Sequence, residues 1–91
     1  MTGYQLENTF ALINKLSIMS DLRSISVAHF NVATQLYKKG QFKQALKEFH
    51  KSIEKDPSFY IVHFWIVKSL ISLQQYDSAT NHFTDYYALF K

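Results

Sequence analysis

Residues 27–49, VAHFNVATQLYKKGQFKQALKEF, recur 34 positions later as residues 61–83, IVHFWIVKSLISLQQYDSATNHF. The identical pairs are His29/His63, Phe30/Phe64, Leu36/Leu70, Gln41/Gln75, Ala45/Ala79 and Phe49/Phe83. The conservative pairs are Val27/Ile61, Val32/Ile66 and Phe42/Tyr76. Similarity at a fixed period of this length indicates structural units that cannot bury their apolar faces alone and must stack on one another. Stacked units of this kind form extended surfaces that bind other proteins.

The composition favours one small helical domain. At 91 residues the chain is near the lower limit for a single stable core. Its apolar content of 47% and aromatic content of 16% are too high for a disordered chain. Two glycines and one proline leave few residues that interrupt helices. Together with apolar residues at helical spacing, this composition predicts an all-α fold.

The charge and the cysteine count narrow the classes of protein. Without cysteine the chain has no disulfide and no thiolate metal site, and because this fits a reducing compartment we expect a cytoplasmic protein. The net charge of +3 is only mildly basic. No run of 18 apolar residues is present, and no basic leader precedes an apolar run. We therefore expect neither a membrane span nor a signal peptide.

The first predicted helix covers Tyr4–Met19. Its apolar residues form two adjacent stripes, and the resulting arc is wide enough to predict burial on more than one side. The two stripes are Leu6, Phe10 and Ile13, and Leu12, Leu16 and Met19. Ser20 and Asp21 are suitable capping residues, so we expect the helix to break there before the next helix begins.

The first repeat is predicted as two helices, Ser26–Lys39 and Phe42–Lys55. Gly40 between them can adopt the left-handed backbone that a tight helix–helix turn needs. The segment Asp56-Pro57-Ser58 ends the second helix, because proline disfavours helix at the preceding residue and can begin a new helix itself. The residues expected to face inward are His29, Val32, Ala33, Leu36, Phe42, Ala45, Leu46, Phe49 and Ile53.

The second repeat follows the same plan, with helices predicted over Phe59–Leu73 and Tyr76–Phe90. Gln74 stands where Gly40 stood, so this turn is expected to form without glycine. The residues expected to face inward are Ile66, Val67, Leu70, Ala79, Phe83 and Tyr87. The predicted organisation is an N-terminal helix and linker over 1–25, a first repeat over 26–58 and a second repeat over 59–91.

The two repeats resemble the tetratricopeptide repeat family. The positions that carry the resemblance are His29, Ala33, Leu36, Tyr37, Gly40, Phe42, Ala45, Leu46, Phe49, Ile53 and Asp56-Pro57, then Leu70, Tyr76, Ala79 and Phe83. The resemblance implies a short right-handed α-solenoid of two helical hairpins after the N-terminal helix. The departures from the family's pattern are His29 and His63 at positions of a large aromatic residue, and Ser52 and Tyr86 at positions of alanine. The chain also ends within the last helix without a polar capping helix, so we expect its apolar end, with Leu89 and Phe90, to be covered.

The resemblance implies a partner-binding concave face made by the first helix of each repeat. Carried over position by position, this face consists of Val27, Phe30, Asn31, Thr34, Tyr37, Lys38, Ile61, Phe64, Trp65, Lys68 and Ile71. Family members that clamp the C-terminal carboxylates of heat-shock chaperones use basic and amide side chains on this face. Phe30, Thr34 and Trp65 occupy such positions here, so we do not expect that clamp.

An apolar groove needs an apolar occupant, because burying a large side chain contributes roughly 1.5–3 kcal/mol. The occupant is either the chain's own first helix or an amphipathic helix of a partner. With a partner, the chain is a small chaperone or adaptor, and its size and groove look similar to small chaperones of bacterial type III secretion systems. Those chaperones hold an amphipathic helix of a secreted or needle-forming subunit. With a self-filled groove, the chain is an assembly scaffold that forms homo- or hetero-oligomers through its uncapped C-terminal helix.

No catalytic or phosphate-binding motif is present, so we expect no enzymatic activity and no cofactor. His29 and His63 lack the further ligands of a metal site, and we expect packed, hydrogen-bonded histidines instead. Lys43, Lys47, Lys51 and Lys55 form either a solvated convex face or a basic strip for an acidic partner or nucleic acid. Because no nucleic-acid motif accompanies the strip, we favour the solvated face and expect no nucleic acid partner.

Overall fold

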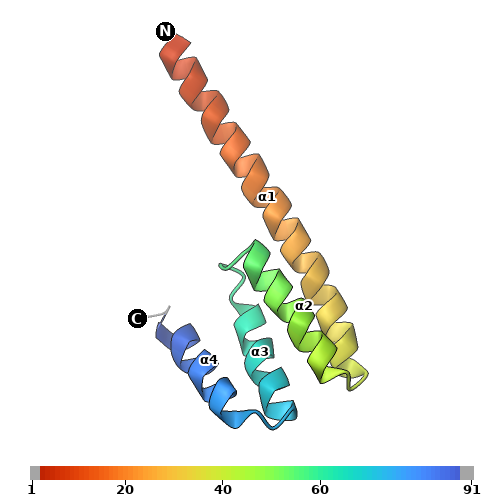
Figure 1. Cartoon of the computed structure of the whole chain (residues 1–91). Coiled ribbons are helices and arrows are strands. Elements are labelled where there is room, and N and C mark those ends of the chain that lie inside the picture. The colour runs from red at the N-terminus through yellow and green to blue at the C-terminus, as the bar shows by residue number, and fades with distance from the viewer. Residues whose placement is uncertain (1–2, 89–91) are drawn as a thin grey trace.

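The computed structural model describes the backbone of residues 3–88 and the side chains of residues 9–88. Four helices, α1 (Gly3–Lys38), α2 (Phe42–Lys55), α3 (Ile61–Ser72) and α4 (Tyr76–Ala88), follow one another through this part of the chain, with no strand among them. Each helix packs on the next, so the order along the chain is also the order in space (Figure 1). The all-α prediction is confirmed.

The expected break at Ser20 and Asp21 is wrong, because α1 is one continuous helix of 36 residues. Capping residues end a helix only where the following backbone leaves the helical conformation, and no glycine or proline lies between Tyr4 and Lys39 to favour that. The predicted linker between the N-terminal helix and the first repeat is therefore helix. The division of the chain at residues 25 and 26 falls inside α1 and stays a prediction.

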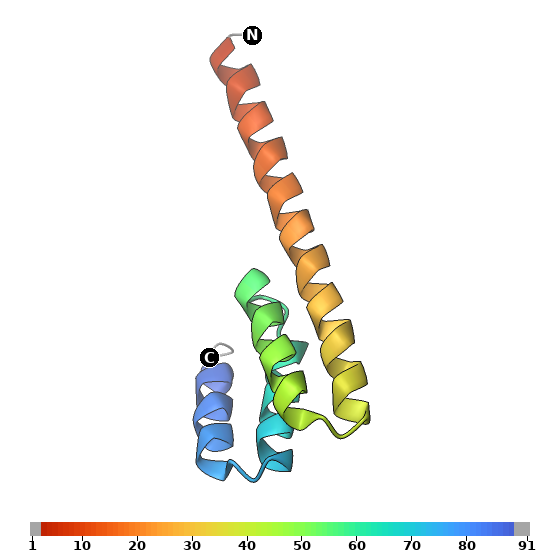
Figure 2. The same ribbon diagram turned by 45° about the vertical axis from the view of Figure 1, so that its right-hand side comes forward.

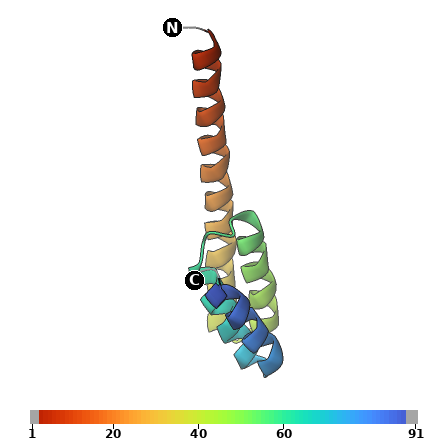
Figure 3. The same cartoon turned by 90° about the vertical axis from the view of Figure 1, so that its left-hand side faces the viewer.

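Residues 9–25 of α1 form an arm that extends past the end of α2 (Figures 1 and 2). The arm keeps this direction in a view turned by 90° (Figure 3). Its large apolar side chains are exposed, by fractions between 37% and 65%, at Phe10, Leu12, Ile13, Leu16, Ile18, Met19, Leu22 and Ile25. The expected burial of this segment is wrong, since only its base, near Arg23, meets the end of α2 and the loop that follows it. The alternative in which the first helix folds back into the groove does not hold either.

The body of the molecule is built around seven buried apolar residues. They are Ala33, Ala45, Phe49, Val62, Ile66, Leu70 and Ala79. The two alanines at equivalent positions, Ala45 and Ala79, allow neighbouring helices to approach closely. Three expected inward residues, Val32, Phe83 and Tyr87, are wrong, because they are exposed by 50%, 53% and 56%. Within residues 3–88, no helix covers the side of α1 that carries Val32 or the side of α4 that carries Phe83 and Tyr87.

The two hairpin turns repeat each other, as predicted. Gly40 has φ of 79° and Gln74 has φ of 61°, so the second turn places a non-glycine residue in the left-handed region. The amide of Gly40 donates to the Tyr37 carbonyl at 2.9 Å, and the amide of Gln74 donates to the Ile71 carbonyl at the same distance. This equivalence of backbone hydrogen bonds establishes the repeat in the structure, independently of side-chain identity.

Helix boundaries differ from the predicted ones mainly around the repeat junction. The predicted bounds of α2 are confirmed, whereas α3 begins at Ile61 rather than Phe59, and Pro57 lies in the loop instead of starting a helix. Helix α4 begins at Tyr76 as predicted. The predicted end at Phe90, and the expected covering of Leu89 and Phe90, lie outside the described residues.

Two polar contacts attach α1 to the end of α2. Ser26 and Ser52 are fully buried, and each hydroxyl donates to the other residue's carbonyl, at 2.7 and 2.8 Å. Ser52 thus has a structural reason to replace the alanine that the family resemblance leads one to expect. At the base of the arm, Arg23 pairs with Asp56, and its guanidinium lies 4.7 Å from the centre of the Phe59 ring. A hydrogen bond from Ser58 and the nearby Arg23 lower the pKa of Asp56.

Candidate partner-binding surface

Helix α3 and the part of α1 that packs on it, residues 27–38, form the α1–α3 face, where the concave surface is expected. Its floor is a cluster of aromatic rings. Trp65 stacks on Phe49 with centroids 5.8 Å apart and meets Tyr37 edge-on at 5.2 Å. Phe30 contacts Phe59 at 5.2 Å and also Phe49 and Trp65. Such edge-on and offset contacts add to the stability gained from burial, so this floor is rigid.

The ammonium group of Lys68 lies over this floor. Its nitrogen is 4.5 Å from the centre of the Trp65 ring, 5.3 Å from that of Tyr37 and 5.5 Å from that of Phe64. Cations within about 6 Å of a ring face are attracted by the ring's electron density. Lys68 is therefore held in place on the surface, where its positive charge is surrounded by apolar rings.

Three large apolar side chains of α3 flank Lys68 and remain close to half exposed. Ile61 is 46% exposed, Phe64 is 50% exposed and Ile71 is 49% exposed. Their spacing of three and seven residues places them on one side of the helix. Together with Lys68 they form a row, here called the α3 row, that combines apolar surface with one positive charge.

The structure divides the predicted binding residues into two groups. Phe30, Tyr37 and Trp65 are half-buried in the aromatic cluster. They mainly pack beneath the surface and contribute less to its exposed part. Ile61, Phe64, Lys68 and Ile71 form the α3 row. The remaining predicted residues lie on α1: Val27 and Thr34 are half-buried, and Asn31 and Lys38 are exposed. The Thr34 hydroxyl donates to the Asn31 carbonyl at 2.9 Å, a contact within the helix.

A comparison with known families finds a match over part of the chain. Residues 26–59, which form the end of α1, α2 and the junction with α3, match the tetratricopeptide repeat family. This segment is a tetratricopeptide repeat. Repeats of this family are protein–protein interaction modules. The second hairpin follows the plan of the first repeat at its turn and at Ala79. No curated protein and no solved structure matches the chain significantly.

The first polar contact between the helices of the tetratricopeptide repeat joins His29 and Glu48. Nδ1 of His29 lies 2.7 Å from a carboxylate oxygen of Glu48, whose other oxygen accepts from Lys51 at 3.1 Å. The hydrogen bond from His29 is the main cause that lowers the pKa of Glu48. Glu48 is therefore ionised in the folded protein at neutral pH.

The equivalent contact in the second repeat is a pair of histidines. Nδ1 of His63 lies 3.0 Å from Nε2 of His82, with the rings stacked 5.2 Å apart. His50 lies near His82, with ring centres 6.2 Å apart, and Tyr86 stacks on His63 at 5.2 Å. Burial is the largest cause that lowers the pKa of all three histidines. The prediction of a packed, hydrogen-bonded histidine describes His63 and His29 correctly.

Sequence analysis missed His82, although a signal for it exists. Glu48 and His82 are 34 residues apart, and so are His29 and His63, so the contact of the first repeat predicts the contact of the second. Within the described part of the chain, no three histidine, aspartate or glutamate residues are arranged to hold a metal ion. No described helix is long and apolar enough to cross a membrane.

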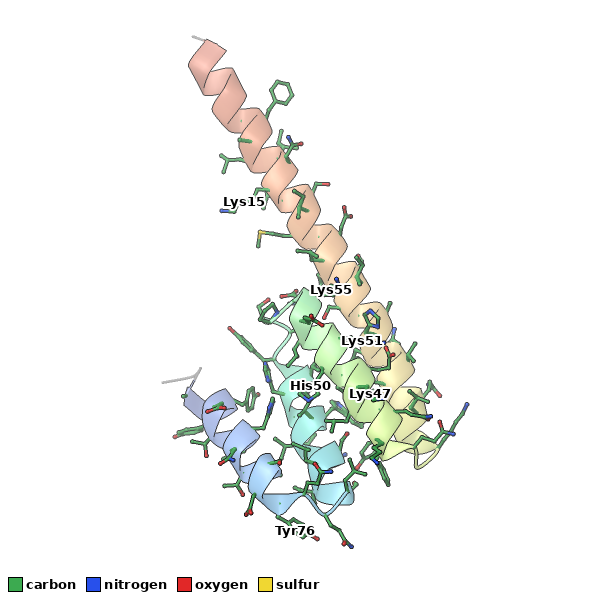
Figure 4. All side chains as sticks on the ribbon, in the orientation of Figure 1. Lys15, Lys47, His50, Lys51, Lys55 and Tyr76 are labelled. Carbon is green, nitrogen blue, oxygen red and sulfur yellow. The ribbon has the colours of Figure 1, made fainter. Side chains whose placement is uncertain are left out.

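The four lysines of α2, Lys43, Lys47, Lys51 and Lys55, are exposed, and Figure 4 labels the last three together with His50. Lys51 contacts Glu48, and Lys43 and Lys47 line an open notch beside Phe42 and the turn at Gly40. Exposed ion pairs of this kind contribute little to stability. The arrangement fits a solvated face, and the function of the strip stays a prediction.

Proposed function

We propose that the chain is a non-enzymatic binding module that holds an amphipathic helix of a partner protein against its α1–α3 face. The observation that supports this proposal is the α3 row, in which Ile61, Phe64 and Ile71 remain about half exposed around Lys68. Large apolar side chains grouped in this way on a folded surface indicate a site of interaction. The rigid aromatic floor beneath them adds to this, because a preorganised surface loses little entropy on binding.

The chemistry of the α3 row describes the partner. An amphipathic helix presents apolar side chains at intervals of three and four residues, which fit the intervals between Ile61, Phe64 and Ile71. A carboxylate on the same helix, beside its apolar stripe, would meet the Lys68 ammonium. Because that ammonium is surrounded by rings rather than by water alone, the pairing is stronger than one on an open surface. The proposed partner is therefore an amphipathic helix with at least one acidic residue at the edge of its apolar stripe.

The role that fits this binding is that of a small chaperone or adaptor. A chaperone of this kind covers the apolar stripe of a helix until the helix reaches its own assembly. The likeness in size and groove to type III secretion chaperones extends the proposal to one class of partner, the amphipathic helix of a secreted or needle-forming subunit. The oligomeric scaffold is the second candidate, and it is supported by the exposed apolar side chains at the open end of α4.

The partner can be identified by purifying the tagged chain from its native host and analysing the bound proteins by mass spectrometry. The decisive measurement then compares the variants Phe64→Ala and Lys68→Glu with Phe10→Ala. Phe64, 50% exposed, is on the α3 row, whereas Phe10, 58% exposed, is on the arm. We expect Phe64→Ala and Lys68→Glu to reduce partner binding at least tenfold, since aromatic anchors dominate interfaces of this kind.

The melting temperature of each variant separates binding from folding. Phe64 is half exposed, so its removal is expected to leave the melting temperature close to that of the wild type. A folded Phe64→Ala variant that binds the partner at full strength would contradict the proposal. Equal loss of binding in Phe64→Ala and Phe10→Ala would also contradict it, because the α3 row would then not be the site.

A further inference from the structure

The open end of the second repeat carries an apolar hollow that the proposed partner site does not use, apart from Ile71 at their shared edge. The hollow has a volume of about 340 Å³ and is called the terminal hollow here. It is lined by Val67, Ile71, Tyr76, Ala79, Thr80 and Phe83. Tyr76 and Phe83 are 59% and 53% exposed, so two aromatic rings remain mostly in contact with water at this end.

The first repeat shows which element packs on the equivalent surface. The residues 34 positions before the lining of the terminal hollow are Ala33, Tyr37, Phe42, Ala45, Leu46 and Phe49. In the first repeat this surface is covered by helix α3, whose Trp65 stacks on Phe49 and meets Tyr37 edge-on. Phe49 is fully buried as a result, whereas its equivalent Phe83 is exposed. The terminal hollow is therefore a suitable docking site for a helix of the same kind as α3.

The arm is a helix of this kind. The fully buried residues of α3 include Val62, Ile66 and Ser69, at intervals of four and three. Leu12, Leu16 and Met19 have the same intervals on the arm, and each is more than half exposed. The arm is also longer than α3, which has 12 residues. Its few charged residues are Lys15, Asp21 and Arg23, so most of its circumference is apolar.

The arm and the terminal hollow of one chain cannot meet. The arm continues α1 without a break, and α1 and α4 are the first and last helices of the stack. In Figures 1 and 2 the arm leaves the body past the end of α2 and is directed away from α4. A straight helix cannot fold back across the body, so an arm in the terminal hollow must belong to another molecule.

We infer that a second copy of this chain supplies the missing helix, with its arm docked in the terminal hollow. The contact joins two exposed apolar surfaces of the described chain, and it repeats the packing of α3 on the first repeat. Each contact joins two different surfaces, so in a symmetric dimer that exchanges its arms the contact occurs twice. Two copies can close on each other by docking both arms, which leaves neither an arm nor a hollow exposed.

A mixing experiment with two variants tests this inference. The arm variant carries Leu12→Glu and Leu16→Glu, and the hollow variant carries Phe83→Glu. All three positions are more than half exposed, so both variants are expected to keep the monomer fold. Sedimentation velocity is expected to show self-association of the wild type and a monomer for each variant alone. The mixture is expected to form a one-to-one dimer, because one intact arm meets one intact hollow.

Two matched controls place charge on the same helices away from the contact. Ser17→Glu lies on the stripe of Phe10 and Ile13, away from the stripe of Leu12, Leu16 and Met19. Thr84→Glu is adjacent to Phe83 but outside the hollow lining. Both are expected to self-associate like the wild type. If circular dichroism shows that Phe83→Glu is unfolded, Phe83→Ala replaces it in the same mixture.

Several results would overturn the inference. A wild type that stays monomeric at all concentrations reached would do so. Self-association of the arm variant would also overturn it, because it indicates contact between two hollows. Self-association of the hollow variant would overturn it too, because it indicates contact between two arms. A mixture that stays monomeric, although the wild type associates, would equally reject docking of an arm in the hollow.

Discussion

Positions 34 residues apart in the two repeats carry the same or similar residues but differ in burial. Phe49 is fully buried and Phe83 is 53% exposed, whereas Val32 is 50% exposed and Ile66 is fully buried. The cause is the place of each helix in the stack. Helix α2 is covered by α3, whereas no described helix covers the equivalent side of α4. Helix α3 packs on α2, whereas no described helix packs on the equivalent side of α1. In a stack of repeats, neighbouring units determine burial as much as the residue itself.

The polar contacts of the two repeats differ in charge instead of burial. Glu48 of the first repeat becomes His82 of the second, so a histidine–carboxylate contact is replaced by two stacked imidazoles. On the outer face, Lys43, Lys47 and Lys51 of α2 correspond to Asp77, Asn81 and Asp85 of α4. The same backbone plan thus carries opposite charge on its two hairpins.

The largest expected effect is on the pair of phenylalanines. Phe49→Ala removes a fully buried ring and is expected to lower the free energy of unfolding by about 3–5 kcal/mol. Phe83→Ala is expected to cost less than about 1 kcal/mol in the monomer, because its ring is already half in water. Urea denaturation monitored by circular dichroism measures both values. Equal losses would show that the two repeats have the same environment, against the structure.

The buried pair of serines is expected to give the next largest effect. Ser52→Ala leaves the Ser26 hydroxyl buried without its partner hydroxyl and removes the donor to the Ser26 carbonyl, at a cost of about 1–3 kcal/mol. The double variant Ser26→Ala with Ser52→Ala removes both hydroxyls and is expected to regain part of this loss. The same denaturation measurement checks both. A double variant that loses the sum of the single effects would reject this coupling.

The equivalent polar pairs are expected to respond to different ranges of pH. The pKa values of His63 and His82 are lowered from 6.5 by burial, so below that value the unfolded chain binds more protons than the folded chain. Stability is therefore expected to fall as the pH drops from about 7 to about 5. The pKa of Glu48 is lowered from 4.5, so its contribution is present above that value and is lost as the pH falls below it.

Melting temperatures measured across this range separate the two pairs. His82→Gln is expected to flatten the dependence between about pH 7 and 5, with His50 and His63 responsible for what remains. Glu48→Gln is the matched control, since it removes the equivalent group of the first repeat and should leave that range unchanged. A slope that persists in His82→Gln at its wild-type value would contradict the assignment to the stacked histidines.

The smallest expected effect concerns the outer lysines. Lys47→Glu changes an exposed charge on α2, and we expect less than about 0.5 kcal/mol in stability and almost unchanged partner binding at physiological salt. Lys68→Glu, on the α3 row, is the contrasting change of the same type. Titrations of the partner at two salt concentrations compare them. A large loss of affinity in Lys47→Glu that diminishes with salt would assign the α2 lysines to binding.

The period of 34 residues was enough to predict both hairpins, the turn at Gly40 and an equivalent turn at Gln74 without glycine. The left-handed backbone of Gln74 is a finding of the structure. The period was not enough to predict burial at Val32, Phe83 and Tyr87, because the pattern within one unit does not say which of its sides has a neighbour. The break at Ser20 and Asp21 was wrong because both residues also fit a helix interior when nothing forces the backbone to leave it. His82 did not follow from the identical pairs, because the equivalent position of the first repeat carries a different residue, Glu48.

Because α1 is unbroken, it is a rigid spacer of fixed length. At a rise of 1.5 Å per residue, its 36 residues span about 54 Å, and one end carries part of the partner face while the other end is the arm. Two copies held together by their arms would therefore present two partner faces at a fixed distance and angle. A filament, or a partner with two helices, would be bound at both faces. The second contact would form at a high effective concentration, because the first contact already holds the partner in place.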